Sequence, residues 1–216
     1  MKSVLVIGLG RFGRHVAIKF NQLGNEVMAV DISESAVKEA LHYIPNAQIG
    51  DCTSIDVMQE LGVRNFDICV VAIGENLSTS LEITYLLKDL GAPFIIARVC
   101  HERHAKFLES MGANEVVYPE KQMANRIAIK HAFQKAYDYI EITPQFSITE
   151  MPVPDRWVGD TIEHVEIRTR YHVNILATKT GDVIEADVES SHVFKADEHI
   201  LVFGKRDDLL KFAQKL

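Results

Sequence analysis

The chain has 216 residues, 47% of them apolar, and its 23 basic and 30 acidic side chains give a net charge of −7. This acidic balance excludes a protein that coats nucleic acid with a generally basic surface. The apolar share is sufficient for a folded core, and no apolar run approaches the ~20 residues of a membrane span. We expect one large domain, or one medium and one small domain, not embedded in a membrane.

The cysteines indicate a reducing compartment. Cys52, Cys69 and Cys100 are scattered, odd in number and form no Cys-x-x-Cys motif. This pattern favours reduced thiols over a disulfide framework or a zinc site. Only a short apolar run precedes Gly8, so no signal peptide is evident. We therefore expect a cytoplasmic protein.

The first 118 residues contain several short apolar runs of the kind that form buried strands. Continuous rather than alternating runs are typical of strands covered on both faces, as in a parallel sheet. The runs are residues 4–7, 27–30, 68–72 and 94–97.

Helix signals separate these runs. Apolar residues at helical spacing predict helices near 12–23 and 83–90, and a glycine follows each one at the expected C-cap. Thr53 followed by Asp56 resembles a capping box that opens a further helix. The alternation of strand and helix predicts an α/β domain with a doubly wound parallel sheet, a Rossmann-like fold.

A longer helix follows Pro119. Residues 120–137 contain no Gly or Pro, and proline is favoured in the first turn of a helix. One apolar stripe of this segment contains Ile127 and several alanines, whereas Ile129 and Phe133 lie off it. Two stripes fit a helix that packs on its own domain and on another subunit, or one buried in a single core. Periodicity alone leaves both readings open.

From residue 139 the pattern changes again. Prolines break the segment, and short strand-like runs and a terminal helix follow, at 174–178, 182–186, 199–203 and 207–215. Gly181-Asp182 is placed as a hairpin turn between the first two runs. We predict two domains, 1–138 with the long helix at about 119–137, and a small α+β domain at 139–216.

The sharpest motif is a glycine-rich loop of the form G-x-G-x-x-G. It follows a predicted strand and opens a predicted helix, the context in which this motif binds a dinucleotide. Gly8 permits the tight turn, Gly10 lets a phosphate approach the backbone, and Gly13 lets the helix pack closely. Asp31 ends the second strand, where a carboxylate accepts ribose hydroxyls and repels a 2′-phosphate, which disfavours NADP.

Arg11 lies inside this loop, where many dinucleotide enzymes have a small or apolar residue. A guanidinium there can reach a terminal phosphate, which shifts the expected ligand from NAD(H) toward ATP or ADP. The alternative is a solvated arginine in the first helical turn.

Further candidate ligand contacts follow the other strands, because open α/β sheets bind ligands at the carboxyl ends of their strands. They are Ile32, Asp51, Cys52, Ile73, Gly74, Asn76 and Arg98. Glu120 begins the long helix, and a carboxylate beside a triphosphate suggests an Mg²⁺ or Ca²⁺ contact. The alternatives are a helix cap for Asp51, a surface ion pair for Arg98 and a helix-dipole partner for Glu120.

Signs of catalysis are missing from the sequence. The histidines are dispersed, and the segment that begins at His101 is not the H-E-x-x-H metal motif. No nucleophile elbow or P-loop lysine is present. These observations predict a protein that binds a nucleotide without performing chemistry on it, and not an enzyme.

Four segments of the first domain together resemble RCK proteins, the regulators of K⁺ conductance. They are Val6–Gly13 (including Phe12), Ala29–Asp31, Val71–Asn76 and Tyr118–Lys121. Within this family the sequence is most similar to the cytosolic gating subunits of bacterial Ktr/Trk potassium-uptake systems. The likeness continues in the second domain, at Arg168–Tyr171 and Asp197–Gly204.

The resemblance implies a crossover helix that dimerises and an octameric ring under a membrane potassium-translocating dimer, at the inner face of the membrane. ATP and ADP would switch the shape of the ring. Arg11, Asp31 and Glu120 match the family's phosphate, ribose and cation positions, and Arg98 stands where some members have lysine. Some relatives bind a cyclic dinucleotide between C-terminal lobes, in the region of Arg168 and His172.

Two other functions fit the sequence less well. A small NAD-dependent oxidoreductase is disfavoured by Arg11 and by a second domain of about 75 residues, too small to carry substrate. An NAD(H)-sensing repressor is disfavoured because the first strand begins near residue 2, which leaves no room for an N-terminal DNA-binding domain. The acidic C-terminal segment is also a poor surface for DNA.

Overall fold

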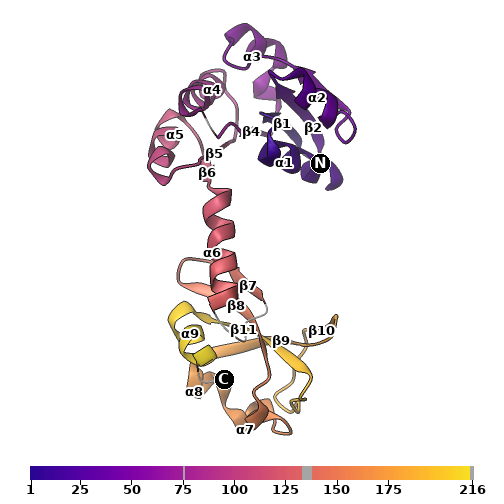
Figure 1. The fold of residues 1–216 in the computed structure, drawn as a ribbon, viewed down its shortest axis with the longest axis vertical. Coiled ribbons are helices and arrows are strands. Elements are labelled where there is room, and N and C mark those ends of the chain that lie inside the picture. Colours follow the sequence, from indigo (N-terminus) through magenta and orange to yellow (C-terminus); the bar gives the residue numbers. More distant parts are fainter. Residues whose placement is uncertain (75, 133–137, 215–216) are drawn as a thin grey trace. The chain divides into compact units, whose positions relative to one another are not determined.

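The computed structural model describes residues 1–74, 76–132 and 138–214. They form two compact units, Met1–Lys121 and Gln122–Leu216, which are described separately below (Figure 1). The division falls within helix α6 (Pro119–Ala132), whereas the sequence prediction assigns that helix to the first domain. None of the helices in these residues is both long and apolar enough to cross a membrane.

The first unit is built on a six-stranded sheet whose neighbouring strands are all parallel. Its strand order is β3-β2-β1-β4-β5-β6. The strands are β1 (Ser3–Ile7), β2 (Glu26–Asp31), β3 (Asn46–Ile49), β4 (Ile68–Val71), β5 (Ile95–Arg98) and β6 (Glu115–Val117). The order reverses between β1 and β4, which is where doubly wound sheets bind their ligands.

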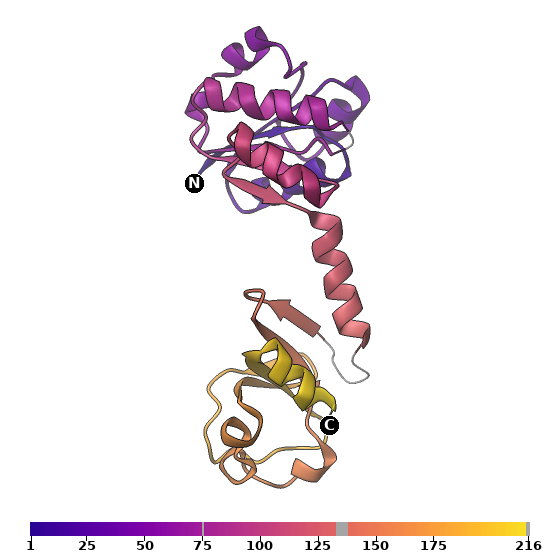
Figure 2. The ribbon, with the colours of Figure 1, turned by 90° about the vertical axis from the view of Figure 1, so that its left-hand side faces the viewer.

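Helices cover both faces of this sheet (Figure 2). They are α1 (Arg11–Gln22), α2 (Glu34–Ala40), α3 (Ile55–Leu61), α4 (Leu77–Asp89) and α5 (Ala105–Met111), with short 3₁₀ turns at Val63–Asn65 and Glu102–His104. One core cluster joins α1 and α2 to the sheet through Ala17 and Val37. The other joins α3, α4 and α5 through Met58, Leu87 and Leu108. The doubly wound α/β fold predicted from the sequence is therefore confirmed.

Two local predictions had different outcomes. Gly24 and Gly91 follow the C-cap residues of α1 and α4, which are Leu23 and Leu90, and their φ of +81° and +84° is expected of glycines that end a helix. The capping box at Thr53 is wrong, because α3 begins one residue later, with Ser54 as its N-cap. The Thr53 hydroxyl instead donates a hydrogen bond of 2.7 Å to the Asp51 carboxylate.

The second unit contains a five-stranded antiparallel sheet in the order β10-β9-β11-β8-β7. Its strands are β7 (Asp138–Glu141), β8 (Phe146–Pro152), β9 (Val173–Thr180), β10 (Val183–Glu185) and β11 (Glu198–Lys205). The helices are α7 (Ile162–Val165), α8 (Ile167–Tyr171) and α9 (Arg206–Gln214), with a 3₁₀ turn at Asp155–Trp157. Trp157 stacks on Phe194 and Phe212 in the core. This is the predicted α+β architecture.

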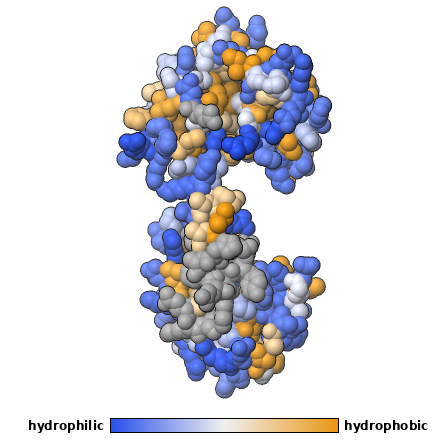
Figure 3. All heavy atoms as spheres, viewed as in Figure 1, coloured by the Kyte–Doolittle hydropathy of each residue, from blue (hydrophilic) through white to orange (hydrophobic). Residues whose placement is uncertain are grey.

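Helix α6 begins at Pro119, as the sequence predicts. Its residues 120–128 are exposed in the single chain, and Met123 and Ile127 retain 53% and 52% of their accessible surface. Figure 3 shows apolar atoms gathered on this part of the helix. The second predicted stripe consists of Ile129 and Phe133, and Phe133 and the side chain of Ile129 lie outside the described residues.

Candidate nucleotide-binding site

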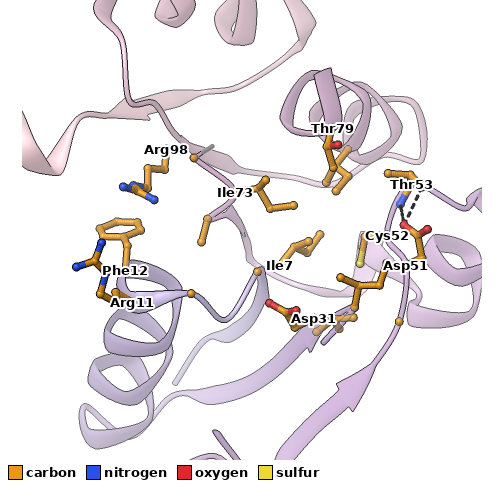
Figure 4. Close-up of a pocket in the computed structure, with 18 of the residues that line it drawn as sticks. Ile7, Arg11, Phe12, Asp31, Asp51, Cys52, Thr53, Ile73, Thr79 and Arg98 are labelled. Carbon is orange, nitrogen blue, oxygen red and sulfur yellow. Dashed lines mark hydrogen bonds between the residues drawn. The ribbon is translucent and has the colours of Figure 1, made fainter. Parts of the chain in front are cut away.

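A cavity of about 1110 Å³ opens at the carboxyl ends of the parallel strands, where the strand order reverses (Figure 4). It is large enough for a mononucleotide or a dinucleotide. Most of the residues predicted for the site line it. They are Gly8, Gly10, Arg11, Phe12, Asp31, Ile32, Asp51, Cys52, Ile73, Gly74, Arg98 and Glu120.

The three glycines of the loop have distinct structural requirements. Gly8 has a φ of +95°, which side chains rarely adopt. A Cβ on Gly13 would collide with the carbonyl oxygen of Gly8, so glycine is needed where α1 leaves the strand. A Cβ on Gly10 would meet no protein atom within 4 Å. The space beside Gly10, at the N-terminus of α1, is therefore open to a ligand that the helix N–H groups can bind.

The carboxylate of Asp31 is tied to the glycine loop. Its Oδ2 accepts a hydrogen bond of 2.5 Å from the backbone N–H of Leu9, and its Oδ1 accepts one of 2.8 Å from Ser33. Each carboxylate oxygen has a second lone pair, which leaves acceptors for ribose hydroxyls. Asp31 therefore orients the loop and also faces the cavity (Figure 4).

One end of the cavity is lined by Asp51, Cys52 and Thr53 (Figure 4). Hydrogen bonds from the hydroxyl and the backbone N–H of Thr53 lower the pKa of Asp51, so this carboxyl stays ionised. Burial, with the charges of Asp51 and Asp31, raises the pKa of Cys52 to about 12. Its thiol is neutral near pH 7 and adds an apolar wall rather than a nucleophile.

The other end of the cavity is lined by two arginines, Arg11 and Arg98. Arg11 lines the cavity and is the first residue of α1. It therefore belongs to the helix, whereas the sequence prediction assigns it to the glycine-rich loop. Among the described residues none forms an ion pair with Arg11. Arg98 forms an ion pair with Glu120, and its guanidinium carbon lies 5.6 Å from the centre of the Phe12 ring. The surface ion pair considered for Arg98 is therefore present, and it lies at the rim of the cavity.

Burial by itself would raise the pKa of Glu120. The hydrogen bonds from its own backbone N–H and from the guanidinium of Arg98, with the positive charges of Arg98 and Arg11, lower the pKa by more. The pKa of Glu120 is consequently lowered, and the carboxylate is available to a cation. No group of three potential metal ligands occurs among the described residues. A divalent cation at Glu120 would therefore need further ligands, such as phosphate oxygens.

Two predicted site residues do not line the cavity. Gly13 acts through close packing, as described above, and Asn76 caps α4 by accepting a hydrogen bond from Thr79. Gly50, which precedes Asp51 at the end of β3 and is expected beside the adenine, also lines the cavity. The sequence does not predict several other lining residues, which are Ile7, His15, Val30, Thr53, Ala72, Thr79, Glu82 and Ile83. His15 follows Arg11 by one helical turn, so this spacing on α1 could have pointed to it.

The chain matches two domain families, TrkA-N over residues 4–119 and TrkA-C over residues 148–216. A relative in Bacillus subtilis, Ktr system potassium uptake protein C, is 36% identical over 215 residues, which are 100% of this chain and 97% of the relative. The chain belongs to the family of proteins built from a TrkA-N and a TrkA-C domain, the RCK proteins that its sequence resembles. The name of this relative identifies the relative as a component of potassium transport and not as an enzyme.

Two solved structures extend the comparison. The GsuK channel bound to NAD has a TM-score of 0.63 and 18% identity, and the match covers 96% of this chain but 38% of the channel. It shows the shared fold. The Kef CTD of Shewanella denitrificans in its AMP-bound form has a TM-score of 0.53 and 25% identity, over 60% of this chain and 79% of that one.

Proposed function

We propose that the protein is a regulatory subunit that senses adenine nucleotides and gates a membrane potassium transporter. ATP or ADP occupies the cavity of the first unit, with NAD(H) as the alternative ligand. The proposal is supported by the relative in the Ktr system and by the AMP-bound Kef CTD. A subunit of this kind acts in the cytoplasm, at the inner face of the membrane, through its membrane partner.

The observation that carries the proposal is the arrangement of charge along the cavity. Asp31 faces it beside the loop, Arg11 lines it where α1 begins, and Arg98 lines it where β5 ends. An adenosine phosphate has ribose hydroxyls that donate to a carboxylate and phosphates that accept from guanidinium groups. Asp51 and Cys52 are left to contact the adenine. The cavity therefore suits a nucleotide from one end to the other.

We infer that the protein acts as a homo-oligomer. The stripe formed by Met123 and Ile127 on α6 is apolar and about half exposed, and this helix is the one that the resemblance assigns to dimerisation. Dimers of this kind would build an octameric ring that contacts the potassium-translocating subunit. We expect no nucleic-acid partner, because the net charge of −7 opposes binding to a polyanion.

A divalent cation, Mg²⁺ or Ca²⁺, would be held by Glu120 together with phosphate oxygens of the nucleotide. Because one chain offers no complete ligand set among the described residues, the cation should bind only when ATP is present. Calorimetric titration of Mg²⁺ should thus give no heat without ATP. With ATP bound, Glu120→Gln should weaken Mg²⁺ binding to the level that the phosphate oxygens alone provide. Equal binding of Mg²⁺ to both proteins would exclude Glu120 as the ligand.

Equilibrium titration of the purified chain with ATP, ADP, NAD and NADH tests the proposed function. We expect ATP and ADP to bind more tightly than NAD or NADH, because a terminal phosphate reaches Arg11 and Arg98. Preference for NADH, with its oxidation by a substrate, would instead favour an oxidoreductase. Absence of binding by all four would overturn the proposal.

A further inference from the structure

The side chain of Arg98 connects three parts of the nucleotide unit. Its Nη2 donates to Oε1 of Glu120 in α6. Its guanidinium lies over the ring of Phe12 in α1 (Figure 4). A Cβ on Gly74, in the segment after β4, would collide with the guanidinium and with the Cys100 sulfur. Arg98 is therefore confined between the phosphate end of the cavity and the start of α6.

The guanidinium has hydrogen-bonding capacity that the protein leaves unused. The Nε of Arg98 is buried and has no hydrogen-bond partner among the described residues. The Arg98 side chain keeps only 17% of its surface exposed, whereas Glu120 keeps 55%. A buried N–H without an acceptor is unfavourable, and a phosphate oxygen is among the strongest acceptors for arginine. A nucleotide phosphate in the cavity would therefore attract the side chain that now binds Glu120.

The start of α6 depends on the same side chain. Glu120 and Lys121 stand in its first turn, and Lys121 forms a second ion pair with Glu102, at 2.7 Å. These two pairs attach the first turn of α6 to the nucleotide unit, and one of them borders the cavity. Only the Arg98–Glu120 pair can respond directly to a ligand.

We propose that Arg98 is a relay for which Glu120 and a nucleotide phosphate compete, so that phosphate charge sets how firmly the first turn of α6 is held. This inference rests on the proposed function and specifies how occupancy of the cavity reaches the helix. The carboxylate and the phosphate are both negative, so drawing Arg98 toward one weakens its hold on the other. By linkage, loosening the helix must strengthen nucleotide binding by the same factor.

Hydrogen exchange of the full chain, read by mass spectrometry in EDTA, tests the relay. The amides of residues 123–126 bond to carbonyls of the first turn of α6, so their exchange reports its attachment. Saturating ATP should speed this exchange roughly two- to fivefold, the size expected when a partly exposed ion pair is lost. AMP should have a smaller effect, because it carries less phosphate charge.

Substitutions at three positions separate the relay from simpler effects. In Arg98→Gln the exchange should already be fast and should not respond to ATP. Arg98→Met, which also removes the charge, replaces this variant if Arg98→Gln does not fold. In Glu120→Gln the response should also be lost, and ATP should bind more tightly without divalent cations. Lys121→Gln is the matched control, since it breaks the ion pair with Glu102 away from the cavity and should keep the ATP response.

Calorimetry on the same samples establishes that each variant is saturated with ATP. A response of Arg98→Gln equal to that of the wild type would overturn the relay, because ATP would then repel Glu120 without Arg98. ATP binding with no change in exchange in the wild type would also overturn it, and would leave the proposed function standing. A wild type that binds no adenine nucleotide would overturn both.

Discussion

Asp31 links two parts of the nucleotide site. Its carboxylate holds the backbone N–H groups of Leu9 and Ser33, and it also faces the cavity. The sequence predicts only the contact with ribose, because its acidic type and strand-end position are visible in the chain. The hydrogen bond to Leu9 depends on how the loop folds back onto β2, which no local pattern reveals.

Asp31→Ala should weaken binding of ATP by roughly 2–4 kcal/mol, since a charge-assisted partner is lost and the Leu9 N–H loses its acceptor. Asp31→Asn keeps one acceptor oxygen and should lose less. Calorimetric titration measures both effects, and circular dichroism establishes that the two variants are folded. Unchanged ATP affinity in Asp31→Ala would show that Asp31 does not contact the nucleotide.

Glu150 on β8 forms ion pairs with two side chains of the second unit. Its Oε1 lies 2.8 Å from Nδ1 of His199 and 3.0 Å from Nζ of Lys179. Burial raises the pKa of Glu150, but the hydrogen bonds and charges of these two partners outweigh it, and the pKa falls below its usual value of 4.5. A carboxyl whose pKa is lowered by folding stabilises the folded state at any pH above its usual pKa. This contribution is lost as the pH falls through the lowered pKa of the folded protein.

Glu150→Gln should therefore reduce the free energy of unfolding by about 1–2 kcal/mol at neutral pH. The difference from the wild type should shrink below pH 4.5, as Glu150 becomes protonated in the wild type. Chemical denaturation from pH 7 down to pH 3 measures this, and Glu163→Gln, at an exposed carboxylate, serves as the control. A difference that stays constant over this range would contradict the pH dependence.

At the scale of helices and strands, the sequence predicts the first unit better than the second. The buried strands β1, β2, β4 and β5 have continuous apolar runs, because helices cover both of their faces. β3 and β6 are edge strands with exposed residues, and they lack this signal. β8 alternates buried and half-buried residues and ends at Pro152, which conceals it in the sequence.

The stripe of α6 formed by Met123 and Ile127 should bury against a second copy of the chain. Ile127→Asp would place an unpaired charge in that interface, which is strongly destabilising and should break the oligomer. Asn125→Asp adds the same charge on the opposite side of the helix and should leave assembly unchanged. Multi-angle light scattering compares the three proteins. A monomeric wild type, or equal masses for all three, would exclude assembly through this stripe.

At the scale of the whole chain, the two units divide the sequence much as the two family matches do. The nucleotide cavity lies entirely within the first unit, Met1–Lys121, and the second unit has its own core around Trp157. Glycine spacing, Asp31 and the strand ends predict most of the cavity. Thr79 and Glu82 escape prediction because they reach the cavity from the first two turns of α4 and belong to no motif, whereas His15 could have been found from its spacing to Arg11 on α1.

A subunit that senses adenine nucleotides must tell ATP from ADP, and we predict that Arg11 does so by contacting the third phosphate, since it lines the cavity next to the open space at Gly10. Titration of the wild type and Arg11→Ala with both nucleotides tests this, with Arg14→Ala as the control on the same helix, since Arg14 pairs with Glu39 instead. Arg11→Ala should weaken ATP more than ADP, by roughly 1–3 kcal/mol for one charged partner. Equal losses for the two nucleotides, or no loss for either, would contradict the claim.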